Sequence, residues 1–543
     1  MNFSVQNRED FIQQSKAEEF DLLVIGGGIT GAGIALDAAI HGLKVVLIEK
    51  ADFASGTSSR STKLIHGGLR YLKQLEFKLV KDVGSERAIV YRNALNIVRP
   101  EKMLLPLTAD GSLGKQSSSL GLWIYDLLAG VKKQEQRRML TKEATLAEEP
   151  LLNSRSLTGG GLYYEYRTDD ARLVMALAKT AYREGAVLLN YCEQKSFVYD
   201  QNSKAIGAIV KDVFSGQEWT IKAKAIVNAT GPCVDVVRKK DNSLFGKRLQ
   251  LTKGVHIVFP YQKLPLKQAA YFDVSDGRMI FAIPRDGVTY VGTTDTVYTQ
   301  DIDRPLASAE DVTYLLSATN AMFPTVNLTL EDITSSWAGL RPLIYQDGIS
   351  PSELSRKDEI ITSESGVISI AGGKLTGYRL MAEKIISLVQ AKLDHHQNKS
   401  ISTKTKVLSG CEFENEMAYQ DFTSSLIKNG LSVTWSKKWA NRYGTRSTEI
   451  FDLYQSILLK ESDQEKALLL AEVNYVIHHE MACKLSDFIV RRSGMLYFEI
   501  ELLKKHLLSI AEEMQGIMQW DDTRTKEEIK DALLLINEAT NFQ

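Results

Sequence analysis

The chain has 543 residues, of which 44% are hydrophobic and 24% are charged, and its formal net charge is −1. These ordinary globular proportions argue against extensive disorder, and the near-zero net charge argues against a large basic surface for nucleic acid. A chain of this length forms about two or three domains, each with its own hydrophobic core.

Residues 1–20 are polar and charged, and they lack the apolar segment of a secretory signal. No apolar run reaches the length of a membrane-spanning helix. The cysteines form no CxxC pair and have no histidine cluster beside them, so we expect neither a disulfide framework nor a metal site. We therefore expect a cytoplasmic protein whose contact with any membrane is peripheral.

Residues 21–50 have the pattern of a dinucleotide-binding βαβ unit. Leu22–Ile25 is a short apolar run, as in a strand that is buried on both faces of a parallel sheet. Gly26 permits the tight turn, Gly28 lets the backbone approach a pyrophosphate, and Gly31 lets the next helix pack closely on the strand. The N-terminus of that helix presents its N–H groups to the phosphates.

A second strand is expected at residues 45–48, with Glu49 at its end. A carboxylate there can accept hydrogen bonds from ribose hydroxyls, and it disfavours a cofactor with a 2′-phosphate. In the polar loop that follows, Thr57 and Ser58 could donate hydrogen bonds to phosphate or could simply be solvated. The unit predicts an adenine dinucleotide and leaves NAD and FAD open.

Between Lys115 and Arg138 an apolar patch lies between basic flanks. This segment could be an amphipathic helix on an anionic membrane, or a helix packed on its own domain or on another subunit. Farther along, a buried strand leads into a second glycine turn near Gly372 and a long helix, and residues 394–406 are typical of a linker. From Glu412 the chain is helical in pattern and shows no obvious chemical constellation.

Several motifs occur in a fixed order over essentially the whole chain. They are the first glycine turn, SSRSTKLIHGGLRYL, AIVNATGP, KGVHIVFP, VGTTDT, AGLRPL, AGGKLTGYR, WANRYG and DFIVRRSGMLYF. With these motifs the chain resembles FAD-dependent glycerol-3-phosphate dehydrogenases. The resemblance implies FAD as cofactor and an α/β fold with a Rossmann-like FAD-binding domain of the glutathione-reductase type, an antiparallel or mixed-sheet substrate domain and a C-terminal helical domain.

The resemblance also implies discontinuous domains. The FAD-binding domain would comprise residues 17–95, 160–250 and 355–395, the substrate-binding domain residues 96–159 and 251–354, and the helical cap domain residues 405–543.

The reaction implied is oxidation of sn-glycerol 3-phosphate to dihydroxyacetone phosphate, with hydride passing from C2 to N5 of FAD and electrons passing on to a membrane quinone. We expect association with the inner face of the cell membrane, and a homodimer is one candidate assembly. A glycerophosphate oxidase, which uses oxygen and makes hydrogen peroxide, is the nearest alternative, but that group usually carries an extra insertion. An amine or amino-acid oxidase, a non-catalytic flavin-binding protein and an NAD-binding module are further alternatives.

The substrate phosphate needs cationic, preferably bidentate, partners. By their places in the family motifs, Arg70, Tyr71 and Arg356 are the expected phosphate contacts. Arg341 is expected near the reacting carbon and its oxygen, and Thr293 is expected to line the pocket.

Departure of hydride from C2 requires a group that takes the hydroxyl proton, and histidine suits this role. His256 is the first candidate for this base and His66 the second, with Arg341 polarising the oxygen. Lys374 opens a helix after two glycines, so it could stabilise the reduced flavin or reach the substrate phosphate.

The expected cofactor contacts combine the first glycine turn with distant segments. Cys233 departs from the family pattern, which has a larger, often aromatic residue at this position. The departure affects the expected packing near the adenine and leaves the expected chemistry unchanged. The predicted contacts are Gly26, Gly28, Gly31, Glu49, Thr57, Ser58, His66, Ala229, Gly231, Gly373, Lys374, Leu375 and Thr376.

Overall fold

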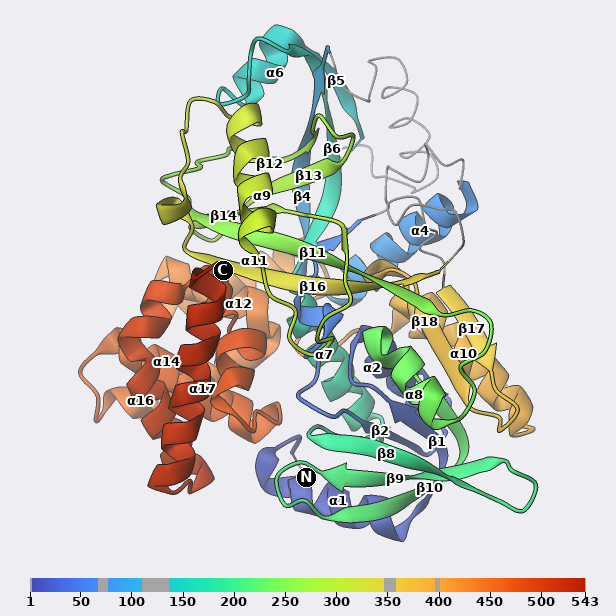
Figure 1. Ribbon diagram of the computed structural model, residues 1–543. Coiled ribbons are helices and arrows are strands. Elements are labelled where there is room, and N and C mark those ends of the chain that lie inside the picture. The colour runs from blue at the N-terminus through green and yellow to red at the C-terminus, as the bar shows by residue number, and fades with distance from the viewer. Residues whose placement is uncertain (1, 67–76, 110–135, 346–357, 396–400, 543) are drawn as a thin grey trace.

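The computed structural model describes residues 2–66, 77–109, 136–345, 358–395 and 401–542 (Figure 1). The predicted α/β architecture is confirmed in this part of the chain, where two sheets lie beside a separate group of C-terminal helices. Most of the segment in which we expected an amphipathic helix, residues 115–135, lies outside the described residues, and Arg138 begins a strand. None of the described helices is long and apolar enough to span a membrane.

The first sheet contains the predicted dinucleotide-binding unit. Its strands are β1 (Glu19–Ile25), β2 (Val45–Ile48), β7 (Val187–Leu189), β8 (Cys192–Tyr199), β9 (Ala205–Asp212), β10 (Glu218–Asn228), β17 (Asp358–Thr362) and β18 (Ile368–Gly372). The strands β18, β10, β1, β2 and β7 are parallel, in that order. The apolar run Leu22–Ile25 is buried within β1, as predicted. Helix α2 (Ile29–Ile40) packs between α7 (Asp170–Arg183) and α10 (Tyr378–Lys392).

The second sheet is mainly antiparallel and carries the motifs that we assigned to the substrate side. Its order is β15-β11-β14-β13-β12-β4-β6-β3, with β16 paired to β11 and β5 paired to β6. Strand β6 runs past residue 160, where the predicted domain boundary lies, because it pairs with β4 along its length. The strands are β3 (Leu64–Ile65), β4 (Val98–Thr108), β5 (Arg138–Thr141), β6 (Leu157–Thr168), β11 (Leu249–Pro260), β12 (Ala269–Asp273), β13 (Met279–Arg285), β14 (Val288–Gly292), β15 (Thr296–Val297) and β16 (Ser335–Ile344).

Helices cover the sheets and form the C-terminal domain, as predicted from Glu412 onward. Trp337 and Tyr290 of the second sheet belong to the same buried apolar cluster as Trp439 and Leu469 of this domain, so the domain packs directly on that sheet. The remaining helices are α1 (Arg8–Ala17), α4 (Phe77–Asn93), α6 (Lys142–Glu148), α8 (Val234–Lys240), α9 (Ala309–Met322), α11 (Glu416–Lys428), α12 (Val433–Tyr443), α13 (Ser447–Leu458), α14 (Gln464–His479), α15 (Met495–Phe498), α16 (Ile500–Met518) and α17 (Asp522–Thr540).

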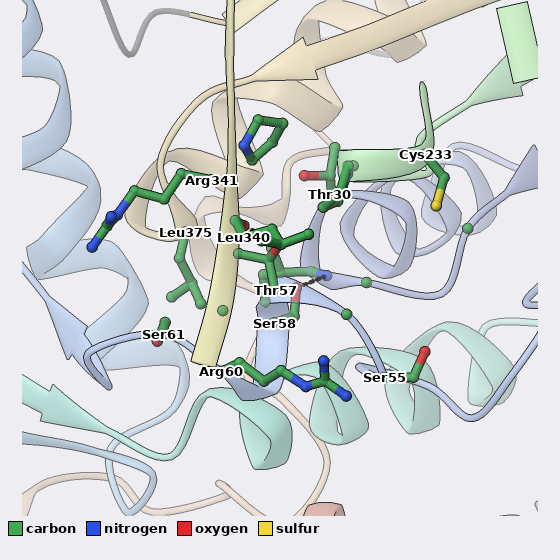
Figure 2. A pocket seen from close by; sticks show the side chains of 18 of the residues that line it. Thr30, Ser55, Thr57, Ser58, Arg60, Ser61, Cys233, Leu340, Arg341 and Leu375 are labelled. Carbon is green, nitrogen blue, oxygen red and sulfur yellow. Dashed lines mark hydrogen bonds between the residues drawn. The ribbon is translucent and has the colours of Figure 1, made fainter. Parts of the chain in front are cut away.

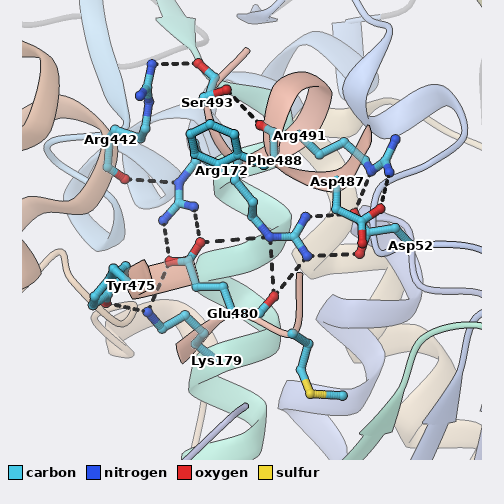
Figure 3. A network of polar contacts seen from close by, with 12 residues as sticks. Asp52, Arg172, Lys179, Arg442, Tyr475, Glu480, Asp487, Phe488, Arg491 and Ser493 are labelled. Carbon is cyan, nitrogen blue, oxygen red and sulfur yellow. Dashed lines mark hydrogen bonds and ion pairs between the residues drawn. The ribbon is translucent and has the colours of Figure 1, made fainter. Parts of the chain in front are cut away.

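A buried ionic network joins the helical domain to the first sheet and its helices (Figure 3). Arg172 of α7 forms a bidentate pair with Glu480, with nitrogen–oxygen distances of 2.5 and 2.8 Å. Lys179, also on α7, lies 3.1 Å from the same carboxylate. Asp52, in the loop after β2, accepts hydrogen bonds from Arg491 at 2.5 Å and from Arg492 at 2.7 and 2.9 Å.

The network keeps Glu480 ionised by lowering its pKa. Burial opposes ionisation of its carboxyl, but the charges of Arg172 and Lys179 outweigh burial and hold the pKa of Glu480 well below its ordinary value of 4.5. Removing one partner from such a cluster leaves a buried charge without compensation, which is more costly than the loss of the contact alone.

We expect Arg172→Met to cost about 3–5 kcal/mol of folding stability, because Glu480 loses its bidentate partner in a buried site. Arg183→Met is the matched control: Arg183 is on the same helix and pairs with Glu412, but both of these side chains are more than 40% exposed. The control should lose less than about 1 kcal/mol. Thermal unfolding followed by circular dichroism measures both variants, and equal losses would contradict the importance of the network.

The depressed pKa of Glu480 makes part of the stability dependent on pH. The contribution of its carboxylate is fully present above its ordinary pKa of 4.5 and is lost as the pH falls from there toward the lower pKa of the folded state. We therefore expect the gap in melting temperature between the wild type and Glu480→Gln to narrow as the pH falls below 4.5. A gap that stays constant with pH would show that ionisation of Glu480 is not its cause.

Candidate active site

A cavity of about 1080 Å³ lies where the two sheets and the helical domain meet. The first sheet contributes the glycine turn after β1, the second sheet contributes residues of β11 and β16, and the helical domain contributes Lys484 and Arg491. The sequence of the helical domain shows no obvious chemical constellation, yet its cationic side chains form part of the cavity wall.

The first glycine turn has the close packing that was predicted for it. Gly26 has a φ of +112°, and a Cβ atom there would lie 2.6 Å from the carbonyl oxygen of Ala229. A Cβ atom at Gly31 would lie 1.9 Å from the carbonyl oxygen of Gly26. Gly28 precedes the first residue of α2 and lines the cavity, so the N-terminus of this helix faces the enclosed space.

Ser58 and Thr57 fix this region from the following loop (Figure 2). The Ser58 hydroxyl accepts a hydrogen bond from the Ile29 N–H at 3.0 Å, which caps the start of α2. The Thr57 hydroxyl donates to the carbonyl oxygen of Leu340 at 2.6 Å and so ties the loop to β16. Ser58 therefore still has a hydroxyl hydrogen to donate to a phosphate, whereas Thr57 uses its hydrogen to join the two sheets.

Glu49 lies at the end of β2, as predicted. Its carboxylate accepts hydrogen bonds from the Gly27 N–H at 2.7 Å and from the Ala51 N–H at 3.0 Å. Burial raises the pKa of Glu49, and these two N–H groups offset part of that effect. A carboxylate oxygen has more than one lone pair, so the group can still accept hydrogen bonds from ribose hydroxyls.

On the second sheet, Arg341 is held beside Thr293 at the cavity wall. Its Nη1 donates to the Thr294 carbonyl oxygen and to Asp295, each at 3.1 Å, and its Nη2 donates to the Thr293 hydroxyl at 2.9 Å. A Cβ atom at Gly254 would lie 2.4 Å from both Arg341 Nη2 and Thr293 Oγ1. The glycine on β11 thus makes the room in which the two predicted site residues meet.

His256 also lines the cavity, but its ring is buried in the sheet and is only 1% exposed. The ring stacks on Trp337 with a centroid distance of 4.7 Å and an interplanar angle of 11°. A Cβ atom at Gly292, the register partner of His256, would lie 2.2 Å from the ring. Burial, together with the charges of Arg341 and Lys63, lowers the pKa of His256 well below 6.5, so the ring is neutral at pH 7.

His66 lies at the end of β3, is half-buried and lines the cavity. Its carbonyl oxygen accepts a hydrogen bond from the Thr376 hydroxyl at 3.4 Å, which connects the HGG motif to the second glycine turn. In that turn Gly372 and Gly373 have φ values of +75° and +81°. Lys374, Leu375 and Thr376 follow them and also line the cavity.

The structure thus brings most of the predicted site residues to one enclosed space. Gly31 does not line the cavity, since its role is to let α2 approach the turn. The predicted phosphate contacts Arg70, Tyr71 and Arg356 lie outside the described residues. The predicted residues that line the cavity are Gly26, Gly28, Glu49, Thr57, Ser58, His66, Ala229, Gly231, His256, Thr293, Arg341, Gly373, Lys374, Leu375 and Thr376.

Sequence reasoning missed several residues of the wall. Lys50 lines the cavity and pairs with Asp303 at 2.5 Å, and its ammonium lies 3.7 Å from Cys233, the residue that the sequence had placed near the adenine. Lys50 directly follows Glu49, which was a usable signal, but no pattern links it to Asp303. Arg60 and Thr62 also line the cavity. Both belong to the motif SSRSTKLIHGGLRYL, of which we had predicted other residues as contacts.

Comparison with known proteins gives the family. The model for FAD dependent oxidoreductases matches residues 21–379, and the model for the C-terminal domain of alpha-glycerophosphate oxidase matches residues 401–525. The aerobic glycerol-3-phosphate dehydrogenase of Bacillus subtilis (strain 168) is 48% identical over 99% of this chain and 98% of that protein. The chain belongs to the family of FAD-dependent glycerol-3-phosphate dehydrogenases.

Solved structures agree with this family. The glycerol-3-phosphate dehydrogenase from Bacillus halodurans, in complex with FAD, matches with a TM-score of 0.85 and 41% identity over 100% of this chain and 99% of that chain. The L-alpha-glycerophosphate oxidase from Mycoplasma pneumoniae matches at a TM-score of 0.56 and 19% identity over 69% of this chain and 95% of that chain, which supports the fold alone.

As a member of this family the protein is an FAD-dependent oxidoreductase, and its residues fit the cofactor. The close glycine turn, the helix N-terminus capped by Ser58 and the carboxylate of Glu49 suit the adenosine and pyrophosphate. The second glycine turn borders the same cavity, where Lys374 and the N–H groups of the short helix after it can face a ring system that gains negative charge.

We expect Gly31→Ala to reduce the FAD content of the purified protein sharply, because the new methyl group would push α2 away from the turn. Gly516→Ala is the matched control, since a Cβ atom there meets nothing within 4 Å in helix α16. It should keep its FAD and gain about 0.5–1 kcal/mol in stability. The ratio of flavin to protein absorbance measures both variants, and full FAD content in Gly31→Ala would contradict the proposed packing role.

Proposed function

We propose that the protein oxidises sn-glycerol 3-phosphate to dihydroxyacetone phosphate and passes the electrons to a membrane quinone. The observation that carries this proposal is one cavity in which the dinucleotide turn, the second glycine turn and the Arg341–Thr293 pair meet. The names of the full-length relatives support the choice of substrate. When bound, FAD supplies the acceptor for the hydride of the substrate C2.

The protein residues would bind the substrate through its charge. Its phosphate carries nearly two negative charges, and a guanidinium can bind such a group with two parallel hydrogen bonds. Arg70, Tyr71 and Arg356 remain our predicted phosphate contacts. Arg341, whose guanidinium is fixed by Thr293 and Asp295, would polarise the oxygen on C2.

For the proton of the C2 hydroxyl we now favour His66 over His256 as the base. His256 is 1% exposed, and its Nε2 is hydrogen-bonded to the Thr62 hydroxyl. A proton acceptor must come within hydrogen-bond reach of the substrate, and the more exposed ring of His66 meets this requirement better than the buried ring of His256. His66 is half-buried, lines the cavity and belongs to the same motif as Arg70.

The electron acceptor and the cell location are also part of the proposal. A quinone acceptor would place the protein on the cytoplasmic face of the membrane as a peripheral protein, and we propose a homodimer as its assembly. Oxygen is the second candidate acceptor, because the C-terminal domain matches a model built on alpha-glycerophosphate oxidase. The lipid-contact hypothesis for residues 115–138 stays a prediction.

The central experiment adds glycerol 3-phosphate to the purified holoenzyme under anaerobic conditions and follows the flavin absorbance. We expect bleaching, and we expect a quinone analogue to restore the colour faster than oxygen does. His66→Gln should slow bleaching by about 10²–10⁴-fold, the usual range for loss of a general base. His395→Gln, at an exposed histidine, is the control that should bleach normally.

The outcomes separate the parts of the proposal. A wild-type flavin that does not bleach would refute the substrate assignment. If the colour returns faster with oxygen and peroxide is formed, the protein is an oxidase and the assignment as a dehydrogenase is wrong. Normal bleaching in His66→Gln would show that a residue other than His66 is the base.

A further inference from the structure

Thr62 joins His256 to the cavity. It lies in the loop before β3, is half-buried and lines the cavity. Its hydroxyl oxygen is 3.0 Å from His256 Nε2, and its carbonyl oxygen accepts a hydrogen bond from the Tyr290 hydroxyl at 3.1 Å. The side chain of Thr62 thus contacts a buried imidazole and also borders the enclosed space.

The loop that carries Thr62 is fixed on both sides of this residue. The Trp337 indole N–H donates to the Ser61 carbonyl oxygen at 3.1 Å. The ammonium of Lys63 lies 2.6 Å from Asp170 of α7 and 5.5 Å from the centroid of the Trp337 ring. A loop held in this way keeps its hydroxyl in one place without the help of a ligand.

The surroundings of His256 decide the direction of the hydrogen bond to Thr62. Its Nδ1 is buried and has no hydrogen-bond partner among the described residues. A neutral imidazole carries one N–H, and a buried N–H without an acceptor is rarer and more costly than a lone pair without a donor. The hydrogen therefore belongs on Nε2, which donates to the Thr62 oxygen.

This direction leaves the hydrogen of the Thr62 hydroxyl free to point elsewhere. No acceptor for it is found among the described residues, whereas the side chain borders the cavity. The hydroxyl is then a hydrogen-bond donor that is fixed in place at the border of the cavity. Arg341 lies on β16, which pairs with the His256 strand β11, and its positive charge acts on His256. Both residues line the cavity.

We propose that Thr62 donates a hydrogen bond to an electron-rich oxygen, carbonyl or phosphate, of the molecule bound in the cavity, and that His256 is the positioning residue that directs this hydrogen. The inference rests on the proposed function for the identity of that molecule. Two sources can supply such an oxygen: a carbonyl of the flavin ring, or the substrate.

The test compares Thr62→Val, which keeps the shape and removes the hydroxyl, with Thr62→Ser, which restores the hydroxyl. Two measurements on the holoenzyme distinguish the sources. One is the midpoint potential of the flavin, and the other is the Kd of dihydroxyacetone phosphate for the oxidised enzyme, followed by the change in flavin absorbance.

If the acceptor is a flavin carbonyl, Thr62→Val lowers the midpoint potential by about 30 mV and leaves the Kd unchanged. For a two-electron couple, about 30 mV corresponds to about a tenfold decrease in the equilibrium constant for reduction. If the acceptor is on the substrate, the Kd rises about tenfold and the potential stays the same. In either case Thr62→Ser behaves like the wild type. The potential is measured without substrate, so that result stands even if the proposed substrate is wrong.

The proposal is overturned if Thr62→Val matches the wild type in both measurements, or if Thr62→Ser is as impaired as Thr62→Val. Circular dichroism and thermal unfolding check that the variants are folded. If Thr62→Val unfolds, the same comparison is made at the other partner: His256→Gln keeps an N–H donor, and His256→Leu does not. His256→Gln should then resemble the wild type, and an equal loss in both His256 variants would overturn the proposal.

Discussion

The arrangement of this protein depends on the pairing of charges that water cannot reach. Asp52 and Glu480 are fully buried, so each requires cations in contact with it, and Arg172, Arg491 and Arg492 supply them. Asp52 lies in the loop just after Glu49, and Arg491 lines the cavity. The interaction that docks the helical domain therefore also builds the wall of the cofactor site, and the position of the domain and the shape of the site cannot vary independently.

Three glycines of the second sheet make room for the site, because they have no side chain. Gly254, Gly292 and Gly339 lie on three paired strands, and a Cβ atom at any of them would lie within 2.4 Å of a neighbouring atom. At Gly339 that neighbour is the carbonyl oxygen of Arg60, in the loop from the first sheet. The missing side chains thus leave room on the sheet for the loop, for the Arg341 guanidinium and for the His256 ring.

The sequence allows a good prediction wherever the physical cause is local. The turn at Gly26 and the strand 45–48 follow from glycine spacing and apolar runs, and the structure confirms both. Two features could not be predicted, because each depends on how distant segments lie together: the pairing of Lys50 with Asp303, and the contact of the buried His256 with Thr62. In the second case the ring of His256 is enclosed by Trp337 and Gly292, and this burial is the reason why we propose His66 as the base.

The ionic network also has a consequence for how the protein is made. Asp52 and Arg492 are 440 residues apart in the chain, yet they are in direct contact. Domains generally fold from the N-terminus onward during synthesis, at about 5–20 residues per second. At such rates the Asp52 carboxylate waits on the order of tens of seconds for Arg492 to leave the ribosome. The nucleotide-binding half is therefore completed by the last quarter of the chain, and truncation there would leave a sheet that can form but a site that cannot close.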